Sequence, residues 1–503
     1  MTIFQFQLLS KGMKMNRREF VYKSFLSAVC AAGLQNLSSC KAAVKDSSKS
    51  KKTNFLVILT DDLGWSDVSY NGSKFYETPN LDKFAAENLT FTNAYSPAPL
   101  CTASRASILT GKNPARTRIT AASLKPYPKP DGRFPPKTKT SAPWQKMVEP
   151  TPYWYMLSEE LTIAEVLRSQ GYKTACIGKW HVGDEEYGPE NQGFEHNFGA
   201  NWQPGPPSYF YPYHIGTITS GVPGEYLTDR LSDEAKKFME ANKNEPFFLL
   251  LSHYAVHTPI QAKAEDVEYY KKKIDPNDCH NNPTYAGMIK SMDENVGEVL
   301  EYLKQSGLDE NTVVIFISDN GGATYKDNNQ VITCNKPLRG GKATLYEGGI
   351  RTPMIVRCPG KTKAEKCQTP VTGTDMFSTI CELAGTETPK EAADSVSIVP
   401  LLKGKNIADR PLYFHFPHYI PVCDTTPCSS IRQGDYKLIK FYEGHSELYN
   451  LSDDIGETKN LAEKMPEKAS QMQKQLEEWI ESVEAQLPIA NSAYDPKAEA
   501  PKQ

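Results

Sequence analysis

Short, nearly continuous apolar runs alternate along the chain with segments in which apolar residues recur at helical spacing. Each apolar run has the length of a strand rather than that of a buried helix. Runs without polar alternation are typical of strands that are buried on both faces of a parallel sheet. Such strands are expected at residues 54–60, 173–178, 246–252 and 312–318.

The segments of helical spacing supply the crossover connections that parallel strands require. An alternation of strands and helices along one chain predicts the α/β class. The expected fold is therefore a large, mainly parallel or mixed sheet sandwiched by helices. The helices are expected within residues 80–88, 162–170, 231–241 and 287–305.

Beyond about Ser397 the pattern changes to shorter segments. Residues 412–419, 430–440 and 447–451 are expected to form edge-like strands, and a helix is expected over residues 466–485. This change predicts one large domain followed by a small α+β subdomain. The expected boundaries are 53–396 for the large domain, 397–490 for the subdomain and 491–503 for a tail.

Residues 1–40 have the features of an export signal. Basic residues precede a moderately apolar stretch, residues 21–37, which is too short to span a membrane comfortably. Residues 16–20 resemble a twin-arginine signal, and the four residues ending at Cys40 resemble a bacterial lipobox whose cysteine would be acylated. A plain thiol near a cleavage site is the alternative for Cys40. We expect an exported protein, periplasmic or at the cell surface, with a polar tether over residues 41–52.

Composition narrows the classes of partner. The 503 residues carry a formal net charge of -3, so there is no basic excess with which to grip a nucleic acid along its length. Recognition of an anion must therefore be local. Residues 123–152 are rich in Pro and Lys, which predicts an irregular surface insertion.

Eleven cysteines in an exported chain suggest disulfide bonds, although their pairing cannot be read from sequence. Cys423 and Cys428 are close enough to close a proline-containing loop. Cys358 and Cys367 are a second candidate pair. Buried free thiols are an equally good interpretation of Cys176 and Cys381.

Polar groups follow all four predicted strands, at the sheet edge where ligands of open α/β sheets bind. The first strand is followed by Asp61 and Asp62, and the fourth by Asp319 and Asn320. Adjacent carboxylates repel one another unless they are solvated or metal-bound, so Asp61 and Asp62 alone could be a surface or helix-capping pair. Together the four residues form an all-oxygen set suited to Ca²⁺ or Mg²⁺, and no local His/Cys pattern points to zinc.

Cations and histidines follow the other two strands. Lys179 and His181 follow the second strand, His257 follows the third, and Lys342 lies in a glycine-containing turn further on. Lysines can donate to the oxygens of an anion, and histidines exchange protons near neutral pH. A solvated lysine or a packed histidine is the ordinary alternative at each position. The remaining histidines expected to be packing or surface residues include His196, His253, His280 and His445.

The pentapeptide from Cys101 to Arg105 carries the most specific signal. It resembles the modification signal of type I sulfatases, in which a Cys followed by Pro or Ala two residues on and Arg four residues on is oxidised to formylglycine. Ala103 is the accepted variant of the commoner Pro. A helix that starts at Cys101 would place Arg105 on the same face. With the other motifs in the expected order, the chain resembles formylglycine-dependent sulfatases of the alkaline phosphatase-like superfamily, especially exported bacterial glycan sulfatases.

The resemblance implies a role for each of these motifs, and a formylglycine-generating enzyme as a maturation partner. One hydroxyl of the hydrated aldehyde would attack sulfur while His257, with Lys342, protonates the departing sugar oxygen. His181 would then help to deprotonate the second hydroxyl, and sulfate would leave without attack by water on sulfur. Arg105 and Lys179 would contact the nucleophile and the sulfate, together with Lys342. A calcium ion would be held by Asp61, Asp62, Asp319, Asn320 and the modified Cys101.

The family also suggests where the substrate lies. The C-terminal subdomain of sulfatases is an antiparallel sheet with a packed helix, and it commonly walls the substrate pocket. His415 and His418 in that subdomain, and Trp202 and His214 in an aromatic loop, are candidates for sugar contacts. Side chains that merely cover hydrophobic surface are the alternative. The implied substrate is a sulfated saccharide, with sulfated galactose or N-acetylgalactosamine favoured.

Two other functions share features with this sequence. A phosphodiesterase or phosphonate monoester hydrolase of the same superfamily makes similar demands, but such enzymes generally have Thr or Ser as the nucleophile and often gather two metals through extra His and Asp ligands. A non-catalytic glycan-binding protein on the same scaffold would be expected to lack Cys101, a metal carboxylate or a lysine, and the chain retains all of them.

Overall fold

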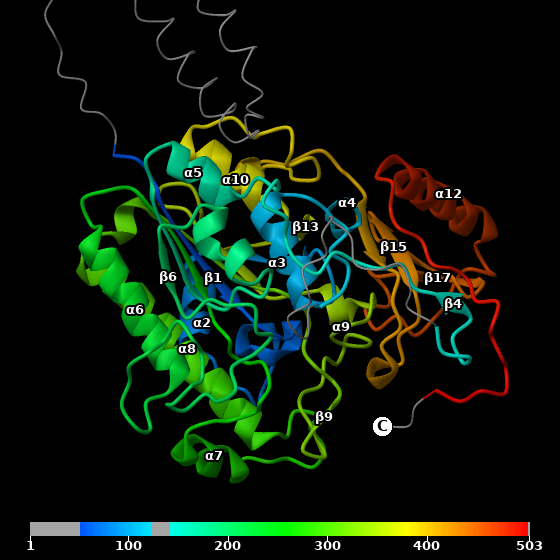
Figure 1. The fold of residues 1–503 in the computed structure, drawn as a ribbon, viewed down its shortest axis with the longest axis horizontal. Helices are drawn as coiled ribbons and strands as arrows, with labels where there is room; N and C mark the ends of the chain where they lie inside the picture. The colour runs from blue at the N-terminus through cyan, green and yellow to red at the C-terminus, as the bar shows by residue number, and fades with distance from the viewer. Residues whose placement is uncertain (1–50, 123–140, 501–503) are drawn as a thin grey trace, which may run out of the picture. The chain divides into compact units, whose positions relative to one another are not determined.

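The four strands predicted from the apolar runs are neighbours in one eight-stranded sheet, in the order β8–β1–β7–β5 (Figure 1). The computed structural model describes residues 51–122 and 141–500. These four strands are parallel, and Thr60 pairs with Ser318 while Ser252 pairs with both Leu59 and Gly178. Their carboxyl ends therefore meet at one edge of the sheet. The strands are β1 (Asn54–Thr60), β5 (Lys173–Gly178), β7 (Phe247–Ser252) and β8 (Thr312–Ser318).

Shorter strands complete the sheet, whose full order is β12–β2–β11–β8–β1–β7–β5–β6. β6 (His196–Phe198) is parallel to β5 at one end. At the other end, β11 (Met354–Arg357) is antiparallel to both β8 and β2 (Leu89–Phe91), and β12 (Glu365–Cys367) is parallel to β2. The sheet is thus mixed, with a parallel centre, as expected.

Helices cover both faces of this sheet, so that successive residues of β1 enter different cores (Figure 1). Leu56 and Ile58 pack with α2 (Pro79–Glu87), α6 (Leu227–Ala241) and α8 (Pro283–Gln305). Phe55, Val57 and Leu59 pack on the opposite face with α3 (Cys101–Thr110), α5 (Ile163–Ser169) and α10 (Asp375–Ala384). The predicted α/β sandwich is confirmed.

The expected helices all form, and two of them begin about a turn earlier than predicted. In α8 the reason is a cap, because the Asn282 side chain accepts from the backbone N–H groups of Thr284 and Tyr285 and Pro283 opens the helix. The remaining short helices are α4 (Pro114–Thr117), α7 (Ala264–Lys271), α9 (Glu347–Ile350) and α11 (Val399–Leu402). Single 3₁₀ turns cover Trp65–Asp67, Ser69–Asn71, Glu185–Tyr187, Pro189–Gln192, Asp309–Asn311 and Pro421–Cys423.

The C-terminal part forms a four-stranded antiparallel sheet with one helix, α12 (Pro466–Ser482), packed on it. Its strands are β14 (Leu412–Phe416), β15 (Cys428–Gln433), β16 (Tyr436–Phe441) and β17 (His445–Asn450). Ile431, Leu438 and Leu448 face Met472 and Leu476 of α12. The opposite face packs on Leu100 and Ala343, the chain neighbours of Cys101 and Lys342.

The prediction of one strand over residues 430–440 was wrong. Gly434 and Asp435 turn the chain between β15 and β16, and Gly434 has a positive φ of 56°. A two-residue turn that begins with Gly is a hairpin signal, which the flanking apolar residues obscured. Two-stranded pairs complete the fold: β3 (Ala94–Tyr95) with β13 (Val371–Thr372), β4 (Met147–Val148) with β18 (Ile489–Ala490), and β9 (Lys326–Asp327) with β10 (Gln330–Val331).

Disulfide pairing differs from both candidate pairs. The bond joins Cys279 to Cys334, with their Cα atoms 5.8 Å apart. Cys423, Cys428, Cys358 and Cys367 are free thiols, and Cys428 is buried in the core under the C-terminal sheet. Cys176 and Cys381 are free and buried. Two cysteines form a disulfide when the fold brings their Cα atoms close together, and a short separation in sequence does not show that it does.

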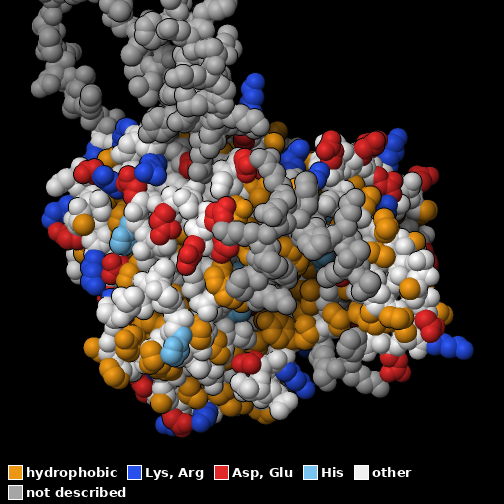
Figure 2. Space-filling view, in the orientation of Figure 1, with side chains coloured by type: hydrophobic (Ala, Val, Ile, Leu, Met, Phe, Trp, Pro, Cys, Tyr) orange, Lys and Arg blue, Asp and Glu red, His pale blue; other side chains and the backbone are white. Residues whose placement is uncertain are grey.

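Several expectations concern segments outside the described residues. These are the export signal over residues 1–40 with Cys40, the tether as far as residue 50, and residues 123–140 of the expected insertion. Within the described residues, no helix combines the length and the apolar character needed to cross a membrane. On the face shown in Figure 2, acidic and basic side chains are interspersed around the periphery, in keeping with the small net charge.

Candidate active site

An acidic cluster lies at the carboxyl edge of the central strands. Asp61 and Asp62 follow β1, Asp319 and Asn320 follow β8, and all four side chains are buried. The backbone N–H of Asp62 donates to Asp319 Oδ1 at 3.3 Å. The Asn320 amide Nδ2 donates to Asp62 Oδ1 at 2.8 Å. Parallel pairing of β1 with β8 therefore brings together two motifs that lie more than 250 residues apart in sequence.

Cys101 points into this cluster from the first turn of α3. Its Sγ lies 3.3 Å from Asp61 Oδ1 and 3.8 Å from Asp62 Oδ1. Burial, together with the charge of Asp61, raises the pKa of the Cys101 thiol well above its usual value. The side chain is therefore a neutral thiol that donates to carboxylates, and an unmodified Cys101 would be a poor nucleophile.

Arg105 lies one turn further along α3 and joins the ends of three strands. Its Nε donates to Asp319 Oδ2 at 2.7 Å, and one terminal nitrogen donates to the Lys179 carbonyl at 3.1 Å and to Ser252 Oγ at 2.5 Å. The Arg105 side chain is 2% exposed. A planar group with several fixed donors can hold these oxygens in one arrangement.

Two lysines neutralise the first acidic pair. Lys179 Nζ donates to Asp61 Oδ2 at 2.5 Å, and Lys342 Nζ donates to Asp62 Oδ2 at 2.7 Å. Burial alone would raise the pKa of Asp62, but the charges of Lys342 and His257 hold that pKa well below its usual value. Asp319 behaves differently, because burial and the charge of Asp61 raise its pKa to about 6. The cluster is therefore a balanced set of buried charges.

His257 and His181 lie on the two sides of this set. His257 Nε2 is 3.7 Å from Asp62 Oδ2, and its Nδ1 donates to the carbonyl of Thr258 at 2.8 Å. Burial, and then the charge of Lys342, lower the pKa of His257 to about 3. His181 Nε2 lies 3.2 Å from the hydroxyl oxygen of Thr102, the residue after Cys101.

The backbone at the site is held in an uncommon conformation. Asp62 and His181 have positive φ angles of 61° and 60°, which residues other than glycine rarely adopt. Such conformations persist where the surrounding structure fixes them, and they concentrate at functional sites. Gly178, at the end of β5, cannot be replaced by a residue with a side chain without a backbone shift, because a Cβ there would lie 1.9 Å from the carbonyl oxygen of Ser252.

The residues present fit a hard divalent cation. Ligand atoms of Asp61, Asp62, Cys101 and His257 all lie within 4.8 Å of one another. In addition, the buried Oδ1 of Asn320 has no hydrogen-bond partner among the described residues. A buried acceptor without a donor beside carboxylate oxygens is the environment that Ca²⁺ and Mg²⁺ prefer. Among the described residues one more group of metal-ligand type occurs, formed by Cys279, His280 and Cys334. Its two sulfurs are joined in the disulfide and are not available as thiolates.

Comparison with known proteins decides the family. The family model described as Sulfatase matches residues 53–386, and the one described as N-sulphoglucosamine sulphohydrolase, C-terminal, matches residues 341–486. The chain belongs to the sulfatase family. It is a sulfuric ester hydrolase of the alkaline phosphatase-like superfamily, and members of its family generally use formylglycine and a metal ion.

Individual relatives of this sulfatase match over most of its length. A sulfatase of Formosa agariphila is 30% identical over 86% of this chain and 89% of its own. The N-acetylgalactosamine-6-sulfatase of Homo sapiens is 30% identical over 72% of this chain and 68% of its own. The crystal structure of Ps i-CgsB in complex with k-i-k-neocarrahexaose is 29% identical over 86% of this chain and 93% of that chain, with a TM-score of 0.69.

The predicted sugar-contacting residues have different surroundings. Trp202 is half-buried in a loop that touches both histidines of the site: the Asn201 carbonyl accepts from the His181 backbone N–H at 2.9 Å, and a Cβ on Gly205 would lie 2.8 Å from His257 Nδ1. His214, further along this segment, is exposed. Trp202 therefore lies in the loop that lines the site.

His415 and His418 are buried, and their rings are bonded within the protein. His415 contacts Ser429 Oγ at 2.8 Å and the Gln486 carbonyl at 3.0 Å. His418 contacts Thr120 Oγ1 at 2.8 Å and Glu149 Oε1 at 3.3 Å. Since these contacts take up the ring nitrogens, we give neither histidine a role in substrate binding.

Some residues at the site were not anticipated. Ser252 ends β7 and bonds both Arg105 and the Lys179 carbonyl, and its place at a strand end was the signal that could have revealed it. Cys423 lies in the electrostatic neighbourhood of Lys342 and Asp62, and burial raises its pKa to about 11. Cys423 packs in the same hydrophobic cluster as Leu100 and Ala343, so the C-terminal part lies beside the residues next to Cys101 and Lys342. Nothing in the sequence around Cys423 indicated this.

Proposed function

We propose that this sulfatase removes sulfate from galactose or N-acetylgalactosamine units of sulfated glycans, with formylglycine at residue 101 and calcium as its metal. The observation that carries the proposal is the position of Cys101 Sγ, 3.3 Å from Asp61 and at the head of the helix that also carries Arg105. In this structure residue 101 is an unmodified cysteine, whose sulfur stands for an oxygen of the mature side chain.

Asp61, Asp62, Asp319 and Asn320 would hold the calcium ion. Calcium bound there would supply charge to screen the sulfate and to lower the pKa of a coordinated hydroxyl. Arg105 orients residue 101, because its guanidinium is fixed by Asp319 and Ser252. Lys179 and Lys342 present ammonium groups on either side of the acidic pair, where they can donate to sulfate oxygens.

Proton transfer falls to the two histidines. We assign protonation of the departing sugar oxygen to Lys342 and His257 together, since both lie beside Asp62. Because the pKa of His257 is lowered, the proton comes from the Lys342 ammonium, and the neutral His257 passes it to the sugar oxygen. Burial would lower the pKa of Lys342, but the charge of Asp62 raises it well above its usual value, so its ammonium is a retained proton source. We assign His181 to accept a proton from residue 101, and its contact with Thr102, the next residue of α3, supports this role. This step would release the sulfate from the enzyme.

The choice of sugar is supported by the relatives and by the loop beside His257. One matched relative is named an N-acetylgalactosamine-6-sulfatase, and one matched structure holds k-i-k-neocarrahexaose. Trp202 in the adjoining loop offers an aromatic face of the kind that packs against sugar rings. The proposed substrate is accordingly a sulfated galacto-configured unit of an extracellular glycan.

A substrate panel tests this proposal. Mature protein would be given defined sulfated galactose, N-acetylgalactosamine and glucosamine saccharides, and released sulfate would be measured with calcium present. A phosphonate monoester serves as the control for the rival activity. The proposal expects the galacto-configured sulfates to react fastest. Preference for sulfated glucosamine would overturn the substrate, and faster phosphonate hydrolysis would overturn the reaction.

We also propose that the protein is exported to the periplasm or cell surface, where such glycans are accessible. The support is the signal-like composition of residues 1–40, with a lipid anchor at Cys40. Cell fractionation of wild type and Cys40→Ala tests both parts. Release of only the variant from the membrane fraction supports the anchor. Retention of the wild type in the cytoplasm contradicts export.

A further inference from the structure

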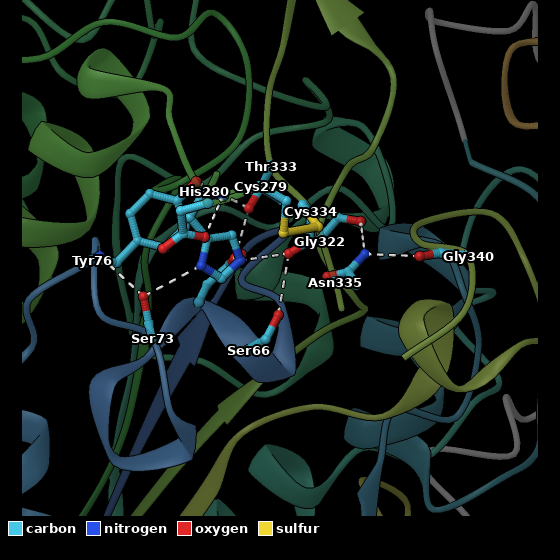
Figure 3. The surroundings of a disulfide bond; sticks show 12 residues. Ser66, Ser73, Tyr76, Cys279, His280, Gly322, Thr333, Cys334, Asn335 and Gly340 are labelled. Carbon is cyan, nitrogen blue, oxygen red and sulfur yellow. Dashed lines mark hydrogen bonds and ion pairs between the residues drawn. A yellow bond between two sulfur atoms is a disulfide. The ribbon is translucent and has the colours of Figure 1, made fainter. Parts of the chain in front are cut away.

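Lys342 and Asn320 reach the site from two loops whose backbones are bonded to each other. The backbone N–H of Lys342 donates to the Gly322 carbonyl at 3.0 Å. The Asn335 side chain bridges the same loops, because its Nδ2 donates to the carbonyls of Gly322 at 2.9 Å and Gly340 at 3.0 Å (Figure 3). Asn335 is 2% exposed. One buried amide thus joins the loop after β8 to the loop that carries Lys342.

The same amide also touches the loop after β1. A Cβ on Gly64, two residues beyond Asp62, would lie 2.5 Å from Asn335 Oδ1, and a Cβ on Gly322 would lie 2.7 Å from it. These glycines leave space for the amide and would be hard to replace. Asn335 therefore packs against all three loops that supply Asp62, Asn320 and Lys342 to the site.

Asn335 is itself anchored by the residue before it. Cys334 is bonded to Cys279 in the loop that precedes α8, and the Cys334 carbonyl accepts from His280 Nε2 at 2.6 Å and from Ser66 Oγ at 3.2 Å (Figure 3). One residue earlier, Thr333 Oγ1 donates to Asp67 Oδ1 at 2.7 Å. A covalent bond and three hydrogen bonds thus fix the backbone from which the Asn335 amide extends.

We propose that Asn335, held by the Cys279–Cys334 disulfide, is a positioning residue that sets where Lys342 lies relative to Asp62. This inference rests on the role assigned to Lys342 under the proposed function. Asn335 acts on Lys342 through two carbonyls: that of Gly340, two residues before Lys342, and that of Gly322, which also accepts from the Lys342 backbone N–H. Misplacement of a catalytic group by about 1 Å lowers a rate by about 100-fold, so a clamp of this kind affects turnover.

Asn335→Ala removes both donated bonds, which leaves the Gly340 carbonyl without the amide donor and the Gly322 carbonyl bonded only to the Lys342 backbone N–H. We expect kcat for nitrophenyl sulfate to fall by about 10-fold to 100-fold. An aryl sulfate is chosen because its leaving group needs no proton and carries no sugar. Its hydrolysis therefore reports on the contact between Lys342 and the sulfate oxygens, which is the role of Lys342 that this test uses. The matched control is Asn295→Ala, because Asn295 is 3% exposed and its amide also donates two hydrogen bonds, to Asp229 and the Ser291 carbonyl.

A double-mutant cycle with Lys342→Ala separates positioning from a merely structural role. If Asn335 acts through Lys342, then Asn335→Ala lowers kcat in the wild type and has little further effect in the Lys342→Ala background. Asn295→Ala should leave kcat unchanged in both backgrounds, although both Asn variants lower the midpoint of thermal unfolding. Equal factors for Asn335→Ala in both backgrounds, or no loss of kcat at all, would overturn the proposal.

The disulfide gives a second route to the same result. The paired variant Cys279→Ala with Cys334→Ala keeps the Asn335 amide but frees its anchor. We expect a smaller fall in kcat, again coupled to Lys342, and this variant decides the question if Asn335→Ala does not fold. Additive effects in this second cycle would also overturn the proposal. Failure of the proposed function can be told apart from failure of this inference. If the role proposed for Lys342 is wrong, Lys342→Ala alone retains the wild-type kcat.

Discussion

Lys179 Nζ lies 2.5 Å from Asp61 Oδ2, and both side chains are fully buried. Lys342 and Asp62 form a second pair, at 2.7 Å. Buried charges persist only when they are paired and hydrogen-bonded, so this cluster is retained against a cost in solvation. Such an arrangement is expected at a site that binds a metal cation through its carboxylates and an anionic ester through its lysines. It is the physical basis of the activity assigned to this sulfatase.

Removal of the metal should abolish turnover. Chelation of the proposed calcium ion would leave the carboxylates at the site without a cation to screen the ester, so sulfate release should fall to background and return when calcium is added. Asp62→Asn should weaken calcium binding by about 10-fold or more, measured by titration calorimetry. The control is Asp293→Asn, a carboxylate that bonds the start of α2 away from the site. Undiminished activity in excess chelator would contradict the metal assignment.

Loss of His257 should depend on the leaving group. His257→Ala should slow release of sulfate from a sugar by about 100-fold, but should slow an aryl sulfate much less, because a phenolate leaves without needing a proton. Initial rates on both substrates give the ratio. His415→Ala is the control, since His415 is bonded to Ser429 and Gln486 within the C-terminal part. An equal loss on both substrates would rule out His257 as the group that delivers the proton to the sugar oxygen.

Lys437 should be critical for stability. Its Nζ lies 2.9 Å from both Glu347 Oε1 and Glu457 Oε1, and all three side chains are fully buried. Lys437→Met leaves these carboxylates without their shared cation, so the free energy of unfolding should fall by about 3–5 kcal/mol. Urea unfolding measures the change. Lys440→Met on the same strand removes a pair with the more exposed Glu477 and should lower the stability by less than about 1 kcal/mol. Similar losses in the two variants would refute the prediction.

His253 should make the protein less stable in mild acid. Burial lowers its pKa from 6.5 to about 4, although the charge of Asp229 opposes the shift, and neither ring nitrogen has a hydrogen-bond partner among the described residues. Between these values the unfolded chain binds the extra proton, so stability falls as the pH drops through this window, by up to about 3 kcal/mol. His253→Phe should reduce that dependence in urea unfolding followed across the window. The same pH dependence in the variant would show that another group is responsible.

The sheet and its polar edge could be predicted because each signal is local. Residues 54–60 are mostly apolar, which predicts a buried strand, and the next two residues are acidic. Because ligands of open α/β sheets bind beyond the carboxyl ends of the strands, this position predicts that the two acidic residues belong to a site. The Cys101 motif is equally local. Parallel pairing of β1, β5, β7 and β8 then brings these residues within contact distance.

What could not be predicted depends on pairs that meet only in the folded chain. Cys279 and Cys334 are 55 residues apart in sequence, and neither is marked by its neighbours. Asn335 has no sequence signal, since an asparagine in a loop is ordinary and its importance comes from the carbonyls around it. His415 and His418 show a related limit of sequence, because residue type did not indicate that both rings would be buried and bonded within the protein.

Sulfate release by the Cys101→Ala variant tests the central claim most directly. Wild type and variant would be produced with a formylglycine-generating enzyme and assayed on the best sulfated saccharide, with calcium present. The account predicts steady turnover by the wild type and no release above background by the variant, because residue 101 supplies the attacking group. Turnover by Cys101→Ala at the wild-type rate would contradict the account.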